Sequence, residues 1–340
     1  MWGRHQYIER ASGRVCEERP FADRLVRWMY NPVREYTPAL FKALTSARFC
    51  SWLGNINYDL DLPLWQKFNA RRHIQWLTRL GVNLDECTVP AAALDTPRKI
   101  FERRIRYAEC RAMDADPSKL AAPADSRMLC GSLEQNGSIH LKNKFFDLVE
   151  LLGMERQRWC TCFSDADFAV FRLTPEKYHY NHVPVSGVIR DQYEIHGQYH
   201  ACNPGAVVAQ VTPFSKNRRL VTIIDTDVNA GSRMGLVAMV EVVALMIGDL
   251  HPCYTSTPGG YAPAAAQVAG TFLRRGQPKS LFRPGSSTVV LLFEPKRVRF
   301  SEDILLNQQC ADIHTRFGVG FGAPLVETEV DVRSTIGTAI

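Results

Sequence analysis

Short apolar runs rich in valine and isoleucine follow one another along the last two thirds of the chain. They occupy residues 168–173, 185–189, 206–211, 220–225 and 235–244, and glycine, proline and asparagine residues separate them. Runs of this length predict β-strands, because β-branched side chains suit a pleated surface and the separating residues form turns. A further run, Val289–Phe293, is apolar throughout and predicts a strand buried inside a sheet.

The first 112 residues have a different pattern, in which apolar residues recur at helical spacing. Leu25, Trp28 and Met29 are separated by charged residues, and further apolar, basic segments follow at 39–52 and 64–80. The expected fold class is therefore α+β, with a helical region at 1–112 and a mainly antiparallel β-sheet domain at 113–340. The helical region either packs an apolar stripe on the core or faces a membrane.

The composition is that of an ordinary globular protein, with 46% hydrophobic and 22% charged residues. A net charge of +6 does not indicate a nucleic-acid partner, but it would suit an anionic membrane surface. No signal peptide and no spanning helix are expected, since no uninterrupted apolar run reaches about 18 residues. Ten cysteines form no CxxC pair, so buried reduced thiols are expected, with a zinc site as the alternative.

The segment 282–288 reads Phe-Arg-Pro-Gly-Ser-Ser-Thr and leads directly into the apolar run that follows it. One interpretation is a tight turn that enters a strand, with Gly285 supplying backbone freedom. The other is a serine that attacks its own backbone. Its hydroxyl would convert the preceding peptide bond to an ester, and elimination and hydrolysis would leave a pyruvoyl group. Such a ketone captures an amine and acts as an electron sink.

Three more segments contain residues that suit chemistry. Residues 178–187 contain His179 and His182, which are either structural or exchange protons near neutral pH. A metal site formed by the two histidines is the alternative, but a zinc ion needs more ligands than this segment supplies. Asp125, in Ala-Pro-Ala-Asp-Ser, is by itself typical of a turn or helix cap. Residues 141–153 form an amphipathic segment in which Phe145 and Leu148 would face the core.

In their order along the chain, these segments resemble the motifs of the phosphatidylserine decarboxylase proenzyme family, and the likeness runs from Tyr7 to Gly337. The branch with a doubled glycine fits best, which makes Ser287 the pyruvoyl precursor and places Ser286 at the second glycine. The other register makes Ser286 the precursor. Cleavage is expected near 286/287, giving a long β chain and a short α chain that stay associated.

The resemblance also implies roles for the other residues. His182 is expected to be the base that helps the serine attack, Asp125 to orient that histidine, and His179 to lie close to the substrate. Phe145 and Leu148 would line the site of the acyl chain. Within the matching segments Ser126 replaces a glycine of the family motif, and Pro278 and Ser280 replace a glutamate and a glycine ahead of the cleavage site.

The function that the resemblance implies is decarboxylation of phosphatidylserine to phosphatidylethanolamine by a self-generated pyruvoyl group. The expected location is peripheral, on the cytoplasmic side of a membrane. A phospholipid is the expected substrate, and no nucleic-acid partner is expected. Whether the protein forms a homodimer is left open. Two alternatives also stay open. The scaffold could decarboxylate a free amino acid, or the chain could remain uncleaved and act as a lipid-binding or hydrolase-like homologue.

Overall fold

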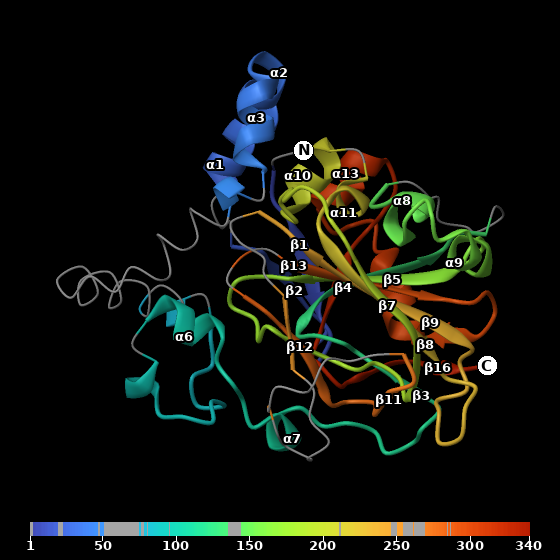
Figure 1. Ribbon diagram of the computed structural model, residues 1–340. Helices are drawn as coiled ribbons and strands as arrows, with labels where there is room; N and C mark the ends of the chain where they lie inside the picture. The colour runs from blue at the N-terminus through green and yellow to red at the C-terminus, as the bar shows by residue number, and fades with distance from the viewer. Residues whose placement is uncertain are drawn as a thin grey trace.

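A computed structural model describes residues 3–19, 23–46, 48–50, 75, 78–79, 81–94, 96–134, 144–210, 212–245, 250–253, 261, 269–283, 285 and 287–340. Its centre is a ten-stranded sheet in which neighbouring strands are antiparallel, except for the parallel pair β1 and β15 (Figure 1). In order across the sheet the strands are β11 (Phe272–Leu273), β7 (Gly187–Ile195), β8 (Arg219–Asp225), β9 (Leu236–Val243), β13 (Ser287–Phe293), β5 (Asp167–Leu173), β4 (Ser126–Ser132), β15 (Glu327–Val330), β1 (Gln6–Glu9) and β2 (Arg14–Glu17).

Strand β13 lies in the middle of this sheet, paired over its whole length with β9 on one side and β5 on the other. All seven of its residues are buried. Its side chains alternate between the two faces, as the pleat requires. Val289, Leu291 and Phe293 belong to one hydrophobic core, whereas Val290 and Leu292 belong to a second core on the other face. We call the first of these the Ser287 face and the second the opposite face.

Short helices cover the opposite face. They are α8 (Leu148–Leu152), α9 (Gln157–Cys162), α11 (Pro213–Lys216) and α13 (Arg316–Phe321), and each places apolar side chains in the second core. Two small sheets complete the fold, one of β10 (Leu250–Pro252), β12 (Pro278–Phe282) and β6 (Tyr180–His182), the other of β14 (Val298–Phe300), β16 (Thr335–Ala339) and β3 (Lys119–Ala121). Apolar residues of both small sheets, among them Phe282 and Ile336, join the core of the Ser287 face.

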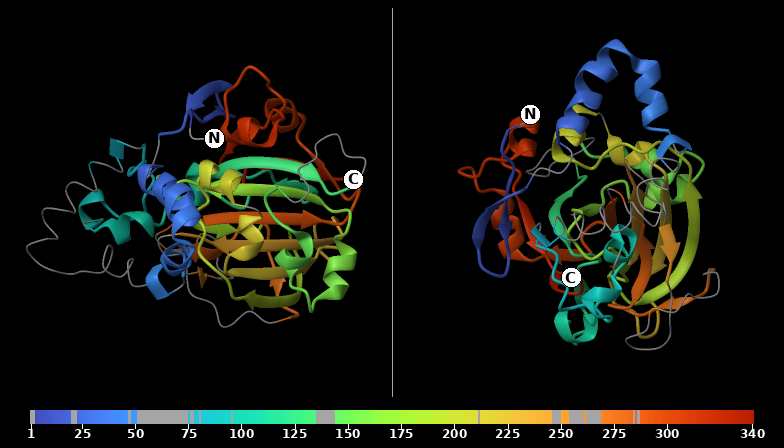
Figure 2. Two further views of the ribbon diagram at one scale, coloured as in Figure 1. Left: turned by 90° about the horizontal axis from the view of Figure 1, so that it is seen from above. Right: turned by 90° about the vertical axis from the view of Figure 1, so that its left-hand side faces the viewer.

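An arm of short helices projects from the body near the N-terminus, as the views in Figure 2 show. It consists of α1 (Asp23–Trp28), the π-helical turn Met29–Val33, α2 (Arg34–Tyr36) and α3 (Pro38–Leu44). The arm is fixed to the body through Tyr30, whose hydroxyl accepts a hydrogen bond of 2.7 Å from the amide of Ala201. Among the described residues, no helix is both long and apolar enough to cross a membrane.

The α+β fold class is confirmed, and most of the expected strands form, including the buried strand that contains residues 289–293. Residues 6–17 correct the expectation of a helical N-terminal region. They form a hairpin whose first strand pairs with β15, more than 300 residues away. Helices begin only at Asp23, and the last part of the region expected to be helical holds two short helices, α6 (Pro97–Phe101) and α7 (Tyr107–Cys110).

The strand expected at 206–211 is wrong, since residues 204–209 form helix α10. Its start explains why. The side chain of Asn203 accepts a hydrogen bond of 2.9 Å from the amide of Gly205, and Pro204 occupies the first helical position. An Asn cap followed by Pro favours helix initiation strongly enough to outweigh two valines. The expected helix at 64–80 falls mostly outside the described residues.

Candidate active site

Ser287 is the first residue of β13 and is almost completely buried. Its Oγ has no hydrogen-bond partner among the described residues. A buried hydroxyl without a partner is costly, so its presence in the middle of a sheet suggests a chemical purpose. Two residues earlier, Gly285 has φ +151°, which disfavours a residue with a side chain. Ser286 lies outside the described residues.

His182 lies on β6 and is fully buried. Its Nδ1 is 2.9 Å from the carbonyl oxygen of Gly276, and its Nε2 is 3.1 Å from the hydroxyl of Tyr178. Burial lowers the pKa of His182 to about 3, so the ring is neutral. A carbonyl can only accept, so Nδ1 carries the proton and Nε2 keeps its lone pair. The ring is therefore held in the tautomer that a base needs.

His179 is also fully buried, and its ring lies against the ring of Phe101 with centroids 3.6 Å apart. Neither ring nitrogen has a hydrogen-bond partner within the described ranges. Burial, followed by the positive charge of Arg103, lowers the pKa of His179 to about 3. A neutral imidazole with two partnerless nitrogens could bind a polar ligand, which suits the expected position beside the substrate.

Asp125 does not contact His182 in the described structure, contrary to the role that the resemblance implies. Its carboxylate accepts hydrogen bonds of 2.8 and 3.0 Å from Arg111 and one of 2.7 Å from the amide of Val332. Burial raises the pKa of Asp125, but the hydrogen bonds from Arg111 outweigh this effect and leave it below the usual value. The position at His182 Nδ1, where the Asp was expected, is taken by the Gly276 carbonyl.

A buried polar network lies beside Ser287 on the same face of the sheet. Ser287 is in register with Val243 of β9, so Glu241, two residues away on β9, is its diagonal neighbour, with Cα atoms expected about 7–8 Å apart. The carboxylate of Glu241 forms an ion pair with Lys279 and accepts hydrogen bonds from Ser280 and from Asn181, the latter at 2.9 Å. All four polar side chains of this Glu241 network are fully buried.

The Glu241 network connects the three strands that carry the expected chemistry. Glu241 is on β9 of the large sheet, Lys279 and Ser280 are on β12, and Asn181 is on β6 next to His182. Ser280, which replaces a glycine of the family motif, supplies one of the hydrogen bonds. Strand β12 ends at Phe282, just before the segment that leads to Ser287. The network therefore fixes the histidine strand and the approach to Ser287 against the central sheet.

Phe145 and Leu148 lie on the opposite face of the sheet. Phe145 is buried in the second core, stacked on Phe214 at 6.0 Å and packed edge-on against Phe317, and Leu148 packs against the same core. Ser287 lies on the other side of the sheet. An acyl chain would have to displace these contacts, so we assign neither residue a contact with the reacting group.

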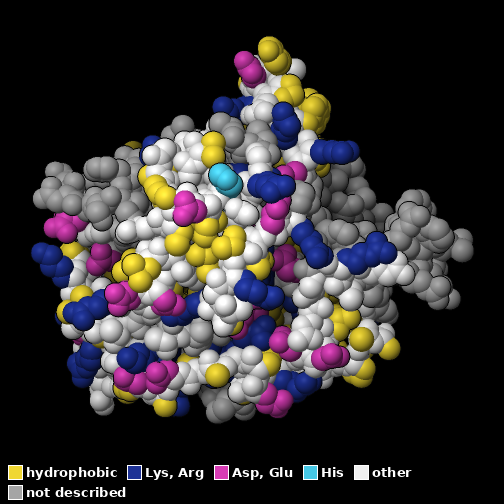
Figure 3. All heavy atoms as spheres, turned by 180° about the vertical axis from the view of Figure 1, so that it is seen from behind, with side chains coloured by type: hydrophobic (Ala, Val, Ile, Leu, Met, Phe, Trp, Pro, Cys, Tyr) yellow, Lys and Arg dark blue, Asp and Glu magenta, His cyan; other side chains and the backbone are white. Residues whose placement is uncertain are grey.

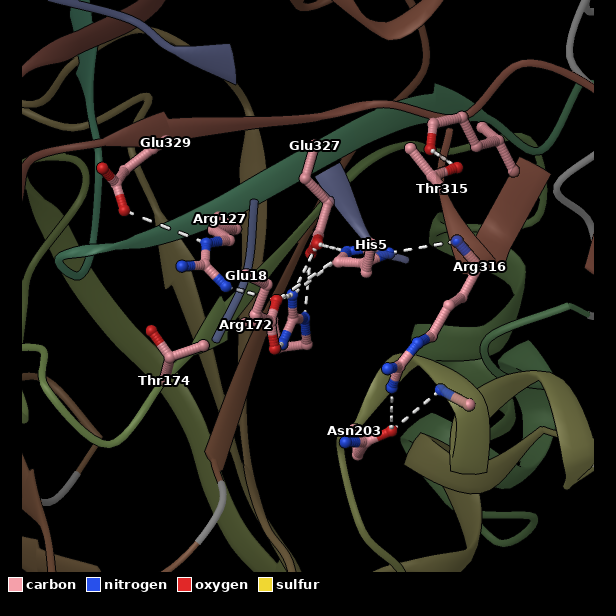
Figure 4. Close-up of polar contacts among 12 residues, drawn as sticks. His5, Glu18, Arg127, Arg172, Thr174, Asn203, Thr315, Arg316, Glu327 and Glu329 are labelled. Carbon is pink, nitrogen blue, oxygen red and sulfur yellow. Dashed lines mark hydrogen bonds and ion pairs between the residues drawn. The ribbon is translucent and has the colours of Figure 1, made fainter. Parts of the chain in front are cut away.

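A second charged cluster lies on the opposite face of the sheet, near Thr288, the residue that follows Ser287 in β13 (Figure 4). It consists of His5, Glu18, Arg127, Arg172 and Glu327, with Arg172 in register with Thr288. Ligand atoms of the histidine and the two glutamates lie within 4.8 Å of one another, as in a metal site. However, Arg172 donates to both carboxylates at 2.5 Å, and His5 is bonded on both ring nitrogens. These groups are satisfied by protein partners, and the cluster reads as an ion-pair network.

Other features add little to the site. All ten cysteines lie within the described residues and are free, and none belongs to the charged cluster. A pocket of about 270 Å³ opens beside Glu18 and Arg127, but neither Ser287 nor the two histidines line it.

The sequence did not predict that Lys279 and Glu241 are partners. The one signal was Glu241, an acidic residue within an otherwise apolar strand.

Known proteins resemble this chain over most of its length. A model of the phosphatidylserine decarboxylase family matches residues 98–323. A phosphatidylserine decarboxylase proenzyme of Bordetella petrii is 30% identical over 264 residues, which cover 74% of this chain and 86% of the relative. One from Chlamydia trachomatis is 26% identical over 336 residues, covering 97% of this chain and 96% of the relative. The chain therefore belongs to the phosphatidylserine decarboxylase family and is a carboxy-lyase of that family.

Proposed function

We propose that this protein is a proenzyme that cleaves itself between residues 286 and 287 and then decarboxylates phosphatidylserine with the pyruvoyl group formed from Ser287. The observation that carries the proposal is Ser287 itself, a buried serine with a partnerless hydroxyl at the start of the central strand. The names of the relatives, which are proenzymes acting on phosphatidylserine, support the same reaction.

Self-cleavage begins when Oγ of Ser287 attacks the carbonyl carbon of residue 286. The O–C bond forms, the C–N bond to residue 287 breaks, and the proton leaves Oγ and ends on the freed amine. His182 is the base that we assign to this transfer, because the Gly276 carbonyl keeps the proton on Nδ1 and leaves a lone pair on Nε2, which accepts a hydrogen bond from Tyr178 in this structure. The charge of Asp125 raises the pKa of His182, but the larger effect of burial lowers it.

The surroundings of Ser287 fit a pyruvoyl group, because Ser287 is buried at the start of β13 and the carboxylate of its diagonal neighbour Glu241 is paired with Lys279. That group would supply an electron sink for the electron pair released with CO₂. The protein's own residues would bind the substrate and exclude water. We assign to His179 the role of holding a polar group of the substrate or returning a proton, since it is buried and its ring nitrogens have no side-chain partner among the described residues.

The projecting N-terminal arm supports a peripheral position on a membrane. Leu25, Trp28, Tyr36 and Leu40 are exposed on it, with Tyr36 77% exposed. Figure 3 shows hydrophobic side chains along this projection, with acidic atoms beside them at its tip and basic side chains lower on its flanks. Exposed aromatic residues beside arginines are typical of helices that lie in a lipid interface. We propose that the arm inserts into the surface of the bilayer that holds the substrate.

Intact-mass analysis of the purified protein tests self-cleavage directly. We expect the wild type to give two fragments, residues 1–286 and 287–340, with the second blocked by a carbonyl that reacts with phenylhydrazine. Ser287→Ala should stay intact, whereas Ser286→Ala, the matched neighbour, should still be cleaved. Fragmentation that depends on Ser286 instead would move the precursor by one residue. An intact wild-type chain that releases no CO₂ from phosphatidylserine vesicles would refute the proposal.

A further inference from the structure

Arg103 is a buried arginine that lacks a carboxylate partner among the described residues. It is 5% exposed. Its two terminal nitrogens donate to backbone carbonyls, one to Ile100 at 3.2 Å and one to Glu176 at 2.8 Å. Its Nε has no partner in the described part of the chain. Burial lowers the pKa of Arg103, and this effect outweighs the opposing effect of the charges of Asp125 and Glu86.

The carboxylates around Arg103 are all engaged by other cations. Glu86 and Asp125 are both held by Arg111, at 3.0 and 2.8 Å. Glu102 pairs with Arg98 at 2.9 Å. The guanidinium of Arg103 is therefore left with backbone carbonyls, which cannot neutralise it. A buried charge without a counter-charge is costly, and a bound anion would supply the charge that Arg103 lacks among the described residues.

Arg103 belongs to a segment that touches the candidate active site at several points. The preceding Phe101 stacks on His179 at 3.6 Å. Glu102 lies 3.7 Å from Arg283, four residues before Ser287. Arg103 itself binds the carbonyl of Glu176, in the loop that joins β5 to the histidine motif. The positive charge of Arg103 also acts on His179. The arginine thus stands beside the groups that would meet the substrate.

We propose that Arg103 binds a phosphate group of the substrate, which makes it a specificity-determining residue; this inference rests on the proposed function. A guanidinium is a planar fork that donates two parallel hydrogen bonds to phosphate or carboxylate oxygens. If Arg103 bound the carboxylate that is lost, it would stabilise the ground state against decarboxylation. The proposal therefore requires a second anion in the substrate. A serine headgroup in phosphodiester linkage has one, and a free neutral amino acid does not.

Binding is tested first on the uncleaved Ser287→Ala chain, so that the outcome does not depend on processing. The probes are O-phosphoserine, inorganic phosphate and free serine, measured by isothermal titration calorimetry. We expect O-phosphoserine to bind at least about tenfold more tightly than serine, and Arg103→Gln to remove this difference. Binding of inorganic phosphate equal to that of O-phosphoserine would mean that the anion alone is recognised, which still supports the site.

Kinetics on the cleaved enzyme then separates binding from structure. With phosphatidylserine, Arg103→Gln should raise KM about tenfold or more and leave the fraction of cleaved chain unchanged, and Arg103→Lys should have a smaller effect. Arg98→Lys, in the preceding helix α6 and already paired with Glu102, is the matched control. Equal losses with phosphatidylserine and with free serine, or O-phosphoserine binding that survives Arg103→Gln, would overturn the inference. An uncleaved wild type with intact O-phosphoserine binding would instead refute the proposed function alone.

Discussion

The ion pair between Lys279 and Glu241 provides the strongest test of how the Glu241 network stabilises the protein. Both side chains are fully buried, and they join strand β12 to the central sheet. Lys279→Met removes the ammonium with little change in side-chain length. It leaves a carboxylate in the core, held only by Ser280 and by Asn181 at 2.9 Å.

Breaking a buried pair by removing one partner typically costs about 3–5 kcal/mol. Because two hydrogen-bond donors remain on Glu241, we expect the low end, about 3 kcal/mol, or roughly a 150-fold shift of the folding equilibrium. The double variant Glu241→Leu/Lys279→Met should recover most of this loss, since no charge is then buried. Asn181 would keep its hydrogen bond of 3.0 Å to Ser280.

The assay is urea unfolding followed by tryptophan fluorescence, with all variants made in the Ser287→Ala background so that one intact chain unfolds. Arg190→Met is the control, because its ion pair with Asp225 is half exposed and should be worth less than about 1 kcal/mol. The reasoning is refuted if Lys279→Met costs no more than this control. It is equally refuted if the double variant is less stable than Lys279→Met alone.

Two further predictions concern pH and the membrane. Burial lowers the pKa of His179 to about 3, against roughly 6.5 in an unfolded chain. Between these two pH values the unfolded state binds more protons than the folded state. The free energy of unfolding therefore falls as the pH drops below about 6.5. His179→Gln should flatten this decline in urea midpoints between pH 7 and 4, whereas the exposed His196→Gln should not; parallel curves would contradict this. In vesicle sedimentation with anionic lipid, Trp28→Ser with Tyr36→Ser should lower binding several-fold, and Val319→Ser, at an equally exposed site on α13, should leave it unchanged.

The local pattern of the sequence predicts the central strands well. A run such as residues 289–293 is apolar on both faces, so it is expected in the middle of a sheet that is covered on both sides. It fails where distant segments decide the structure. Residues 6–9 form a strand because β15 offers an edge more than 300 residues away. It also fails at residues 204–209, where the cap at Asn203 overrides the strand-like composition.

The candidate site is predicted as a set of residue types, but its connections are not. The sequence shows two histidines, an aspartate and a serine in the order of the family motifs, and in the structure Asn181, next to His182, bonds Glu241 on the face of the sheet that carries Ser287. It cannot show that Arg111 binds Asp125, or that a backbone carbonyl replaces it at the imidazole. Backbone carbonyls leave no mark in the sequence, and buried charges find partners on strands that only the fold brings together.

The position of the cut explains how a chain could be broken without loss of its fold. Ser287 is the first residue of β13, so cleavage before it lies outside the ladder that pairs this strand with β5 and β9. The strand that would begin the short chain is fully buried between two neighbours, and its removal would expose five large apolar side chains. We therefore expect the two chains to separate only under conditions that unfold the sheet. The new end would stay where the serine was, beside Glu241 and on the same face as the histidine strand.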